Sequence, residues 1–173
     1  MSINKLSASK VFDPESPAVK KDLAEINSWK IRLYLLQNLP TAFWWRLKVK
    51  SCSPYRTEIE VPFNWRTKNP FKSIYFAALA GAGELSTGLM AGLVIRNTAS
   101  KISMLVTNVE VDFIKKANAA TTFTCDEGIK IIEGIQKAID TNQGVEVSLN
   151  STGVKKDGEI VAKFRITWSF RVK

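Results

Sequence analysis

The most constraining feature of the sequence is an apolar segment of 22 residues, 73–94 (SIYFAALAGAGELSTGLMAGLV), in which Glu84 is the only charge. A segment of this length can span a membrane. A carboxylate at the centre of a bilayer costs at least ~2.5 kcal/mol, however, and four glycines dilute the apolarity further. We therefore expect a long helix buried in a protein core, about 73–92, and no integral membrane segment.

Strand patterns lie on both sides of this helix. Two short alternating runs before it, around 47–52 and 58–63, predict a hairpin. After it, a long strand is expected to carry four apolar residues on one face: Leu105, Val109, Val111 and Phe113. A strand at 121–125 follows, and then a helix capped by Asp126 with an apolar stripe of Ile129, Ile132, Ile135 and Ile139. Two strands around a turn near 156–158 end the chain.

The last strand has the clearest pattern in the chain. Its alternate residues are apolar: Ile160, Ala162, Phe164, Ile166, Trp168, Phe170 and Val172. Charged residues occupy much of the other face, as in antiparallel sheets with one solvated side. One helix buried nearly all round, beside about six antiparallel strands, implies an α+β fold in which the sheet curls around the helix.

An N-terminal extension, 1–39, precedes the domain, which we place at 40–173. After a polar start, Pro17 to Leu39 reads as one amphipathic helix that Ser16 caps and Pro40 ends. Phe43, Trp44 and Trp45 then form an aromatic cluster. This cluster is either a lid on the domain or an anchor on a membrane surface.

The composition excludes several classes of function. The chain has no histidine, which argues against a zinc site and against Ser-His or Cys-His catalysis. Its net charge of +9 favours an anionic partner or a basic surface. The cations form no recognisable nucleic-acid module, so no nucleic-acid partner is expected. The N-terminus lacks the apolar core of a signal peptide, which predicts a cytoplasmic protein.

The segment from Asn69 to Glu84 resembles the hotdog-fold thioesterase superfamily, in particular a branch similar to the phenylacetate-pathway acyl-CoA thioesterases. Members carry an Asn, a small residue and a His at the start of the helix, with an Asp or Glu nine positions after that His. Asn69, Ser73 and Glu84 match this pattern, whereas Tyr75 stands where the His is expected. The resemblance covers roughly 39–172 and implies the hotdog fold, thioester hydrolysis and a dimer or a dimer of dimers.

Glu84 is the principal candidate for chemistry. It shares a helical face with small residues only, at the spacing of Ala77, Gly81, Gly88 and Ala91. A carboxylate in that setting has a raised pKa unless it finds donors, for which Ser86 and Thr87 are candidates. It would act as a general base or as a nucleophile in hydrolysis of an acyl-CoA thioester. The alternative is a structural glutamate at a dimer interface.

The start of the helix would supply the oxyanion site. We expect the backbone N–H groups near Tyr75 and Phe76 to serve there. Nine residues of helix span about 13 Å, so the helix start of one subunit would have to work with Glu84 of another. Asn69 either positions substrate or is a turn residue, and Ser73 is a candidate helix cap or substrate contact. Tyr75 can donate a hydrogen bond in catalysis.

Further substrate contacts are expected from loop residues. Arg96 and Lys101 after the helix, and Arg66 and Lys68 before it, are candidates because the phosphates of coenzyme A require cations. Thr87, on the helix itself, is a further candidate substrate contact. Coenzyme A enters only as part of the substrate, so we expect no cofactor and no metal. Two alternatives stay open: a non-catalytic acyl- or acyl-CoA-binding hotdog protein, and a protein that binds anionic surfaces through its positive charge.

Overall fold

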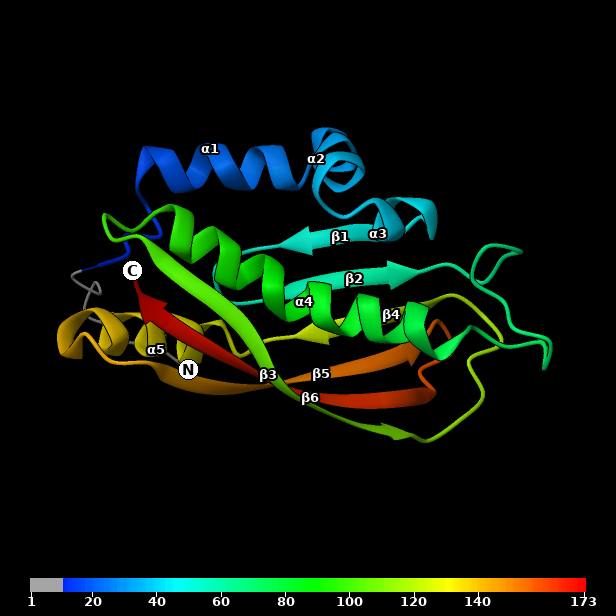
Figure 1. Cartoon of the computed structure of the whole chain (residues 1–173). Helices are drawn as coiled ribbons and strands as arrows, with labels where there is room; N and C mark the ends of the chain where they lie inside the picture. The colour runs from blue at the N-terminus through cyan, green and yellow to red at the C-terminus, as the bar shows by residue number, and fades with distance from the viewer. Residues whose placement is uncertain (1–10) are drawn as a thin grey trace, which may run out of the picture.

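A computed structural model describes residues 11–173 (Figure 1). The helices are α1 (Pro17–Ile26), α2 (Lys30–Asn38), α3 (Pro40–Trp44), α4 (Phe76–Arg96) and α5 (Gly128–Thr141). The strands are β1 (Lys48–Cys52), β2 (Thr57–Val61), β3 (Ile102–Phe113), β4 (Thr121–Cys125), β5 (Val145–Lys155) and β6 (Ile160–Val172). The polar start predicted for the extension lies largely outside the described residues.

The six strands form one antiparallel sheet in the order β1-β2-β4-β5-β6-β3. Figure 1 shows this sheet curving around α4, with α1 to α3 beside the β1 edge. The alternation predicted for β6 is confirmed: Phe164, Ile166 and Trp168 are buried, while Lys163 and Arg165 are exposed. The predicted hotdog architecture is therefore the observed one.

Helix α4 is the core of the domain. Twelve of its residues are buried, and a Cβ at Gly83 would lie only 3.2 Å from the Phe164 ring, so the helix packs closely on β6. The helix is long and apolar enough to cross a membrane, but 67% of an apolar stretch of 18 residues within it is buried inside the protein. That burial is typical of a core helix.

The N-terminal extension differs from the prediction, because two helices replace one. Ser16 caps α1 as expected, accepting from the Val19 N–H at 3.3 Å. The helix ends at Asn27, whose side-chain amide donates to the Cys52 carbonyl oxygen at 2.9 Å. The Cys52 N–H in turn donates to Asn27 Oδ1 at 2.8 Å. These bonds to the end of β1 compete with helix continuation, so α2 starts in a new direction.

A bulge in β3 overturns one predicted face. The register with β6 shifts between Val106 and Asn108, which moves the earlier residues of β3 to the opposite face. Leu105 pairs with the outward-facing Ser169, whereas Val109, Val111 and Phe113 pair opposite the core-facing residues of β6. Leu105 therefore does not share the face of the other three.

The stripe predicted for α5 is also shifted. The helix follows Glu127 rather than Asp126, and Glu127 makes no side-chain cap. Its buried face is Gly128, Ile131, Gly134, Ile135 and Ala138, and Ile129 is exposed. Gly134 decides this orientation, because a Cβ there would lie 2.3 Å from the Val147 side chain on β5.

Candidate functional site

One face of α4 is only partly covered by the rest of the fold. Ala77, Gly81, Glu84 and Gly88 are all half-buried and recur at helical spacing. Ala91, expected on this face, is fully buried, and Gly92 takes its place. Because every neighbour of Glu84 on this face is Ala or Gly, another chain or a ligand can approach the carboxylate closely. We call these five residues, Ala77, Gly81, Glu84, Gly88 and Gly92, the open stripe.

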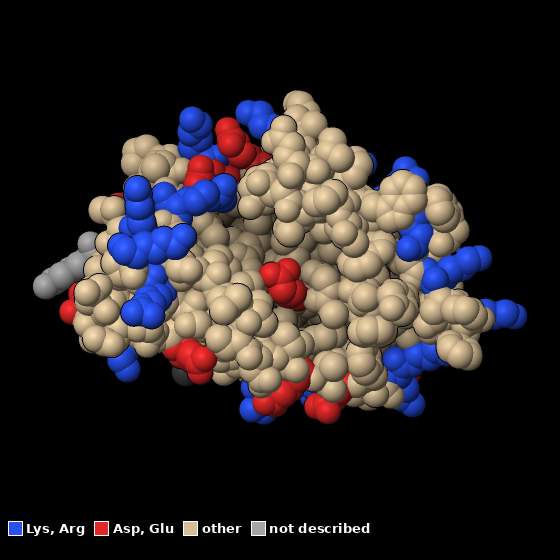
Figure 2. All heavy atoms as spheres, viewed as in Figure 1, with Lys and Arg blue, Asp and Glu red and all other residues tan. Residues whose placement is uncertain are grey.

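The Glu84 carboxylate lies over Gly88. A Cβ at Gly88 would be 3.1 Å from Glu84 Oε1 and equally close to the Trp168 ring, so only glycine leaves both in place. Within residues 11–173 no group donates a hydrogen bond to this carboxylate, and no cation pairs with it. Burial consequently raises the pKa of the Glu84 carboxyl above its ordinary value. Figure 2 shows an acidic side chain alone among uncharged residues in a hollow of this face.

The two hydroxyls expected to serve Glu84 are engaged elsewhere. Thr87 is fully buried; it donates to the Glu84 backbone carbonyl at 2.9 Å and accepts from Trp168 Nε1 at 2.9 Å. Ser86 donates to the Gly83 carbonyl and bonds Ser151, both at 2.7 Å. The predicted donor roles are therefore wrong, and a buried Thr87 is not exposed to substrate. Its bond instead holds the Trp168 indole beside Glu84.

The start of α4 differs by three residues from the prediction. The cap is Tyr75, with extended backbone and no side-chain cap bond, so Ser73 is not the N-cap. The Tyr75 N–H already donates to the Thr67 carbonyl at 2.6 Å. Among the described residues, the N–H groups of Phe76 and Ala77 have no acceptor. The donors at this helix start are therefore Phe76 and Ala77, and Tyr75 does not contribute its backbone N–H.

Asn69 organises the turn before the helix. Its Oδ1 accepts from the N–H groups of Phe71 at 3.0 Å and Ser73 at 3.2 Å, and from the Ser73 hydroxyl at 3.1 Å. This is the turn role that the sequence left open for Asn69. Ser73 is thereby bound within the turn, so its hydroxyl proton is already donated.

A hollow of about 600 Å³ lies in front of this helix start. It brings together four predicted residues, Asn69, Ser73, Tyr75 and Phe76. It also includes Lys115 and Lys116, which follow β3 and have no ion-pair partner within residues 11–173. The sequence shows that the two lysines are adjacent. It does not show that the end of β3 packs against the start of α4, which is what brings them to this hollow.

The remaining predicted contacts lie elsewhere. Arg96 is at the far end of α4, ~30 Å from the helix start, where it pairs with Asp22 at 3.9 Å and lies over the Tyr34 ring. Lys101, exposed just before β3, is also at that end. One chain therefore does not bring these two cations to the hollow. Glu84 is separate from it too, because eight residues of helix place it ~12 Å from Phe76.

The aromatic cluster is split by the fold. Trp45 packs on α4, where a Cβ at Gly81 would lie 3.0 Å from its ring. Trp44 is exposed, and the Arg66 guanidinium lies 5.0 Å from its ring and 4.7 Å from that of Trp65. Arg66 is thus committed to stacking, and Lys68 is exposed beside it. No cluster of metal-ligating side chains occurs in the part of the chain that the structure describes.

Known structures share this fold across most of the chain. A protein of unknown function from Pseudomonas aeruginosa, a probable thioesterase, is 16% identical with a TM-score of 0.70, covering 84% of this chain and 97% of its own. A mutant thioesterase from Pseudomonas aeruginosa is 12% identical with a TM-score of 0.65, covering 84% and 95%. The PaaI protein of the E. coli phenylacetic acid degradation operon is 14% identical with a TM-score of 0.60, covering 87% and 96%.

Because these sequence identities are low, the similarity to these structures shows the hotdog fold alone. No curated protein matches the chain significantly. A family model does match, over residues 32–170, and its description is a domain of unknown function, DUF4442. That match spans α2 to β6 and includes the open stripe, the turn at Asn69 and the hollow. The chain is therefore a member of the DUF4442 family and has the hotdog fold.

Proposed function

We propose that the protein is an acyl-CoA thioesterase in which Glu84 acts at a homodimer interface. The observation that carries the proposal is the Glu84 carboxylate itself: it is half-buried on an open face and unpaired within the described residues. A carboxylate with a raised pKa lies closer to the range in which a general base works well at neutral pH. The hotdog thioesterases of known structure share the fold, which is consistent with this chemistry.

In the proposed reaction, Glu84 takes a proton from water while the water oxygen attacks the thioester carbonyl. The carbonyl oxygen becomes an oxyanion, which the Phe76 and Ala77 N–H groups of the partner subunit stabilise. Collapse of this intermediate breaks the carbon–sulfur bond, and the proton held by Glu84 passes to the leaving sulfur, so coenzyme A leaves as a thiol, the other product is a carboxylic acid and Glu84 is again a carboxylate. Direct attack by the Glu84 carboxylate, with an anhydride that water then hydrolyses, uses the same groups. Lys115 and Lys116 are placed to meet phosphates of coenzyme A.

The exposed inner face of β3 supports the dimer. Val109 and Phe113 are 48% and 51% exposed although they lie on the face that packs on α4 in the other strands. β3 is also a sheet edge with 12 residues. Long apolar edges of this kind are normally covered, and a second copy would cover them symmetrically. Such a dimer would bring the helix start of one subunit toward Glu84 of the other.

Hydrolysis of an acyl-CoA panel tests the chemistry. We expect Glu84→Gln to lower kcat/KM by about 100-fold or more, because the amide accepts no proton from water. The control is Glu133→Gln, an exposed glutamate on α5 that should hydrolyse as the wild type does. Equal rates for Glu84→Gln and wild type would sink the proposal, as would absence of hydrolysis across the panel.

Sedimentation velocity tests the interface. We expect Val109→Lys to convert the protein to a monomer and to abolish hydrolysis with it, since each subunit would have to bury an unpaired lysine in the β3 interface. The control is Tyr55→Lys, in the turn after β1, where the replaced ring is 42% exposed. An unchanged oligomer for Val109→Lys would exclude β3 as the interface.

Mixed dimers test whether the site is shared. Glu84→Gln and Ala77→Pro, which removes one free N–H in a helical turn that tolerates proline, should each be inactive alone. Coexpression with different tags should restore about a quarter of the wild-type activity, since half of the random dimers carry one intact site. If the purified mixed dimer stays inactive, the two groups do not act across the interface.

The alternative function is acyl or acyl-CoA binding without turnover. The composition of the hollow favours it: within residues 11–173 the lining contains Phe71, Tyr75, Phe76 and Phe113 but no carboxylate, and a tyrosine side chain is a poor general base. This version predicts saturable acyl-CoA binding by wild type and by Glu84→Gln with equal affinity, and no release of thiol from either.

A further inference from the structure

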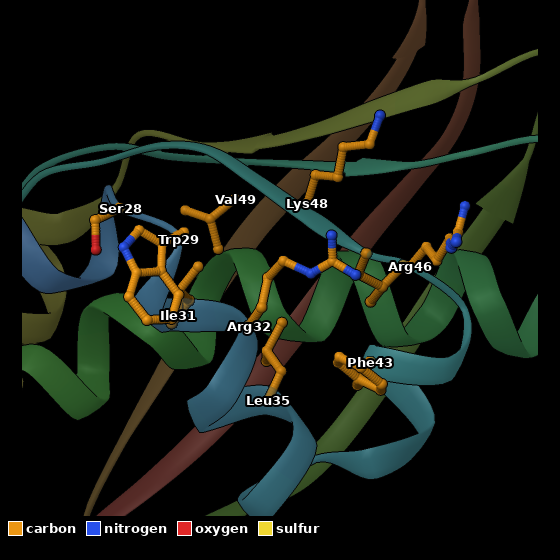
Figure 3. A pocket seen from close by; sticks show the side chains of 10 residues that line it. Ser28, Trp29, Ile31, Arg32, Leu35, Phe43, Arg46, Lys48 and Val49 are labelled. Atoms are coloured by element: carbon orange, nitrogen blue, oxygen red, sulfur yellow. The ribbon is translucent and has the colours of Figure 1, made fainter.

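A second cavity lies away from the open stripe, between α2, α3 and β1. Its volume is about 360 Å³, within the range of small-molecule sites. The two ends of the cavity differ in chemistry. Figure 3 shows Trp29 and Ile31 at one end and the side chains of Arg32 and Arg46 toward the other, while the Lys48 side chain extends away from both.

The walls of this cavity are held by specific bonds rather than by loose packing. The Asn27 side-chain amide bonds both backbone groups of Cys52, which ties the end of α1, just before α2, to the end of β1. At the other end, the Leu47 N–H donates to the Ala42 carbonyl at 3.0 Å and joins α3 to the start of β1. The cavity is therefore preformed, which lowers the entropic cost of binding.

The cationic end is not neutralised by the protein. Lys48 pairs with Glu60 at 2.8 Å. Arg32 and Arg46 have no carboxylate partner within the described residues, and the Arg32 guanidinium lies 5.7 Å from the Phe43 ring. Among the residues that the structure describes, no Asp or Glu lines the cavity. Two guanidinium groups without counter-charges at one end of a cavity suit an anionic group, which they can bind through paired N–H donors.

Arg46 occupies a backbone position that favours glycine. Its φ is 60°, where side chains other than Gly, Asn and Asp are uncommon. Its N–H donates to the Phe43 carbonyl at 3.0 Å, which closes the end of α3 in the manner usually left to glycine. A residue that lines the cavity thus occupies a backbone position where arginine is uncommon, and such positions occur at binding sites.

The other end of the cavity is apolar. Ile31, Leu35 and Leu47 are buried beneath it, and Val49 contributes from β1. The Trp29 indole lines the rim although it is 69% exposed, so it has unused apolar surface for a ligand. An apolar lining beside two arginines that have no carboxylate partner within residues 11–173 matches a molecule with an aliphatic chain and an anionic head.

We propose that this cavity binds a single aliphatic chain that ends in a carboxylate or a phosphate. The site goes beyond the proposed hydrolysis, since neither Glu84 nor the start of α4 lines it. Arg32 and Arg46 hold the head, and Ile31, Leu35 and Trp29 enclose the chain. An acyl carboxylate and a lipid phosphate share this chemistry, and the two are separated by the choice of probe.

Calorimetric titration of the full chain with decanoate, decyl phosphate and decanol, each as a monomer in solution, tests the proposal. Decanoate or decyl phosphate should bind saturably, and at least tenfold more tightly than decanol. A preference for decanoate assigns a fatty acid, and a preference for decyl phosphate assigns a phosphorylated lipid. From octanoate to decanoate the affinity should rise up to roughly fourfold per methylene. Equal binding of decanol and both anions would overturn the proposal.

Arg46→Gly removes the head contact without endangering the fold, because glycine suits the left-handed backbone. It should weaken binding of the preferred anion roughly tenfold or more and leave decanol unchanged. The matched control is Lys72→Gly, which removes a cation from a position with φ 59° outside the cavity and should bind as the wild type does. An unaffected Arg46→Gly, or an equal loss in Lys72→Gly, would overturn the proposal.

The two sites are distinguished by Glu84→Gln, which should bind decanoate with wild-type affinity whether or not the protein hydrolyses acyl-CoA. If Glu84→Gln weakens decanoate binding and Arg46→Gly does not, the anion occupies the open stripe and the cavity proposal fails. Because binding is measured without turnover, failure of the thioesterase proposal leaves this result intact.

Discussion

Polar side chains on the two faces of α4 differ in their hydrogen bonding. On the buried face, Ser86 is fully enclosed and bonds both the Gly83 carbonyl and Ser151. On the open stripe, Glu84 is half-buried and its carboxylate has no partner within residues 11–173. Burying a hydroxyl without a hydrogen-bond partner costs less free energy than burying a carboxylate without one. In this structure, however, the hydroxyl has its partners and the carboxylate has none within residues 11–173.

This difference indicates that Ser86 has a structural role and that Glu84 has a different role. Where α4 packs on β5, the buried Ser86 hydroxyl forms a hydrogen bond with Ser151. The Glu84 carboxylate on the same helix has no such bond within the described residues. A structural glutamate would be expected to have donors near it. The small residues around Glu84 instead leave space, and Trp168 is held beside it through Thr87. Experiments on the two faces should therefore separate stability from activity.

The largest effect on stability is expected at the buried face. Ser86→Ala leaves the buried Ser151 hydroxyl without its partner, which should lower the free energy of unfolding by about 1–3 kcal/mol. Hydrolysis per folded molecule should not change. Urea denaturation with parallel rate measurements checks both. The double variant Ser86→Ala/Ser151→Ala should cost less than the two single losses added; simple additivity would show that the bond contributes little.

A smaller effect, on activity, is expected on the open stripe. Gly88→Ala places a methyl group 3.1 Å from the present position of Glu84 Oε1, so the carboxylate must move, and kcat/KM should fall roughly tenfold. The matched control is Gly92→Ala, where nothing lies within 4 Å of the added methyl. That variant should gain about 0.5–1 kcal/mol of stability from helix propensity and keep its activity. Equal activity in both variants would mean that the position of Glu84 does not matter.

The smallest effect is a pH dependence of stability. Burial raises the folded-state pKa of Glu84 above its ordinary value of 4.5. The folded state therefore favours the protonated carboxyl, and wild type loses stability relative to Glu84→Gln as the pH rises through the raised pKa. Below the ordinary pKa this penalty is absent. The Tm difference between Glu84→Gln and wild type should grow by a few degrees from pH 4 to pH 8; a constant difference would mean that Glu84 has a donor in solution.

Several parts of the fold and site follow from local pattern. The alternation of β6 predicts its buried face, because one side of an antiparallel strand faces the core. The position of Glu84 among small residues follows from helical spacing alone. Both predictions depend on residues that are near in sequence. The structure confirms both, except that Gly92 stands on the face of α4 where Ala91 was expected.

Other parts depend on contacts that the sequence does not display. The break after α1 requires Asn27 to meet Cys52, 25 positions later. The face of Leu105 depends on a bulge in β3. Thr87 donates its hydroxyl proton to the Glu84 backbone carbonyl and accepts a hydrogen bond from Trp168, 81 positions later, so it is fixed away from the Glu84 carboxylate. In each case a hydrogen bond or a register shift overrides the local pattern.

The sequence by itself determined that a long apolar helix carries one carboxylate and that strands must cover it, because periodicity and burial are linked by simple geometry. It also determined that this carboxylate sits among small residues. Only the tertiary structure decided that the carboxylate is left without donors, that the free N–H groups are those of Phe76 and Ala77, and that two lysines after β3 reach the start of α4. These outcomes depend on which distant segments pack together, and side-chain hydrogen bonds are formed only after that packing is settled.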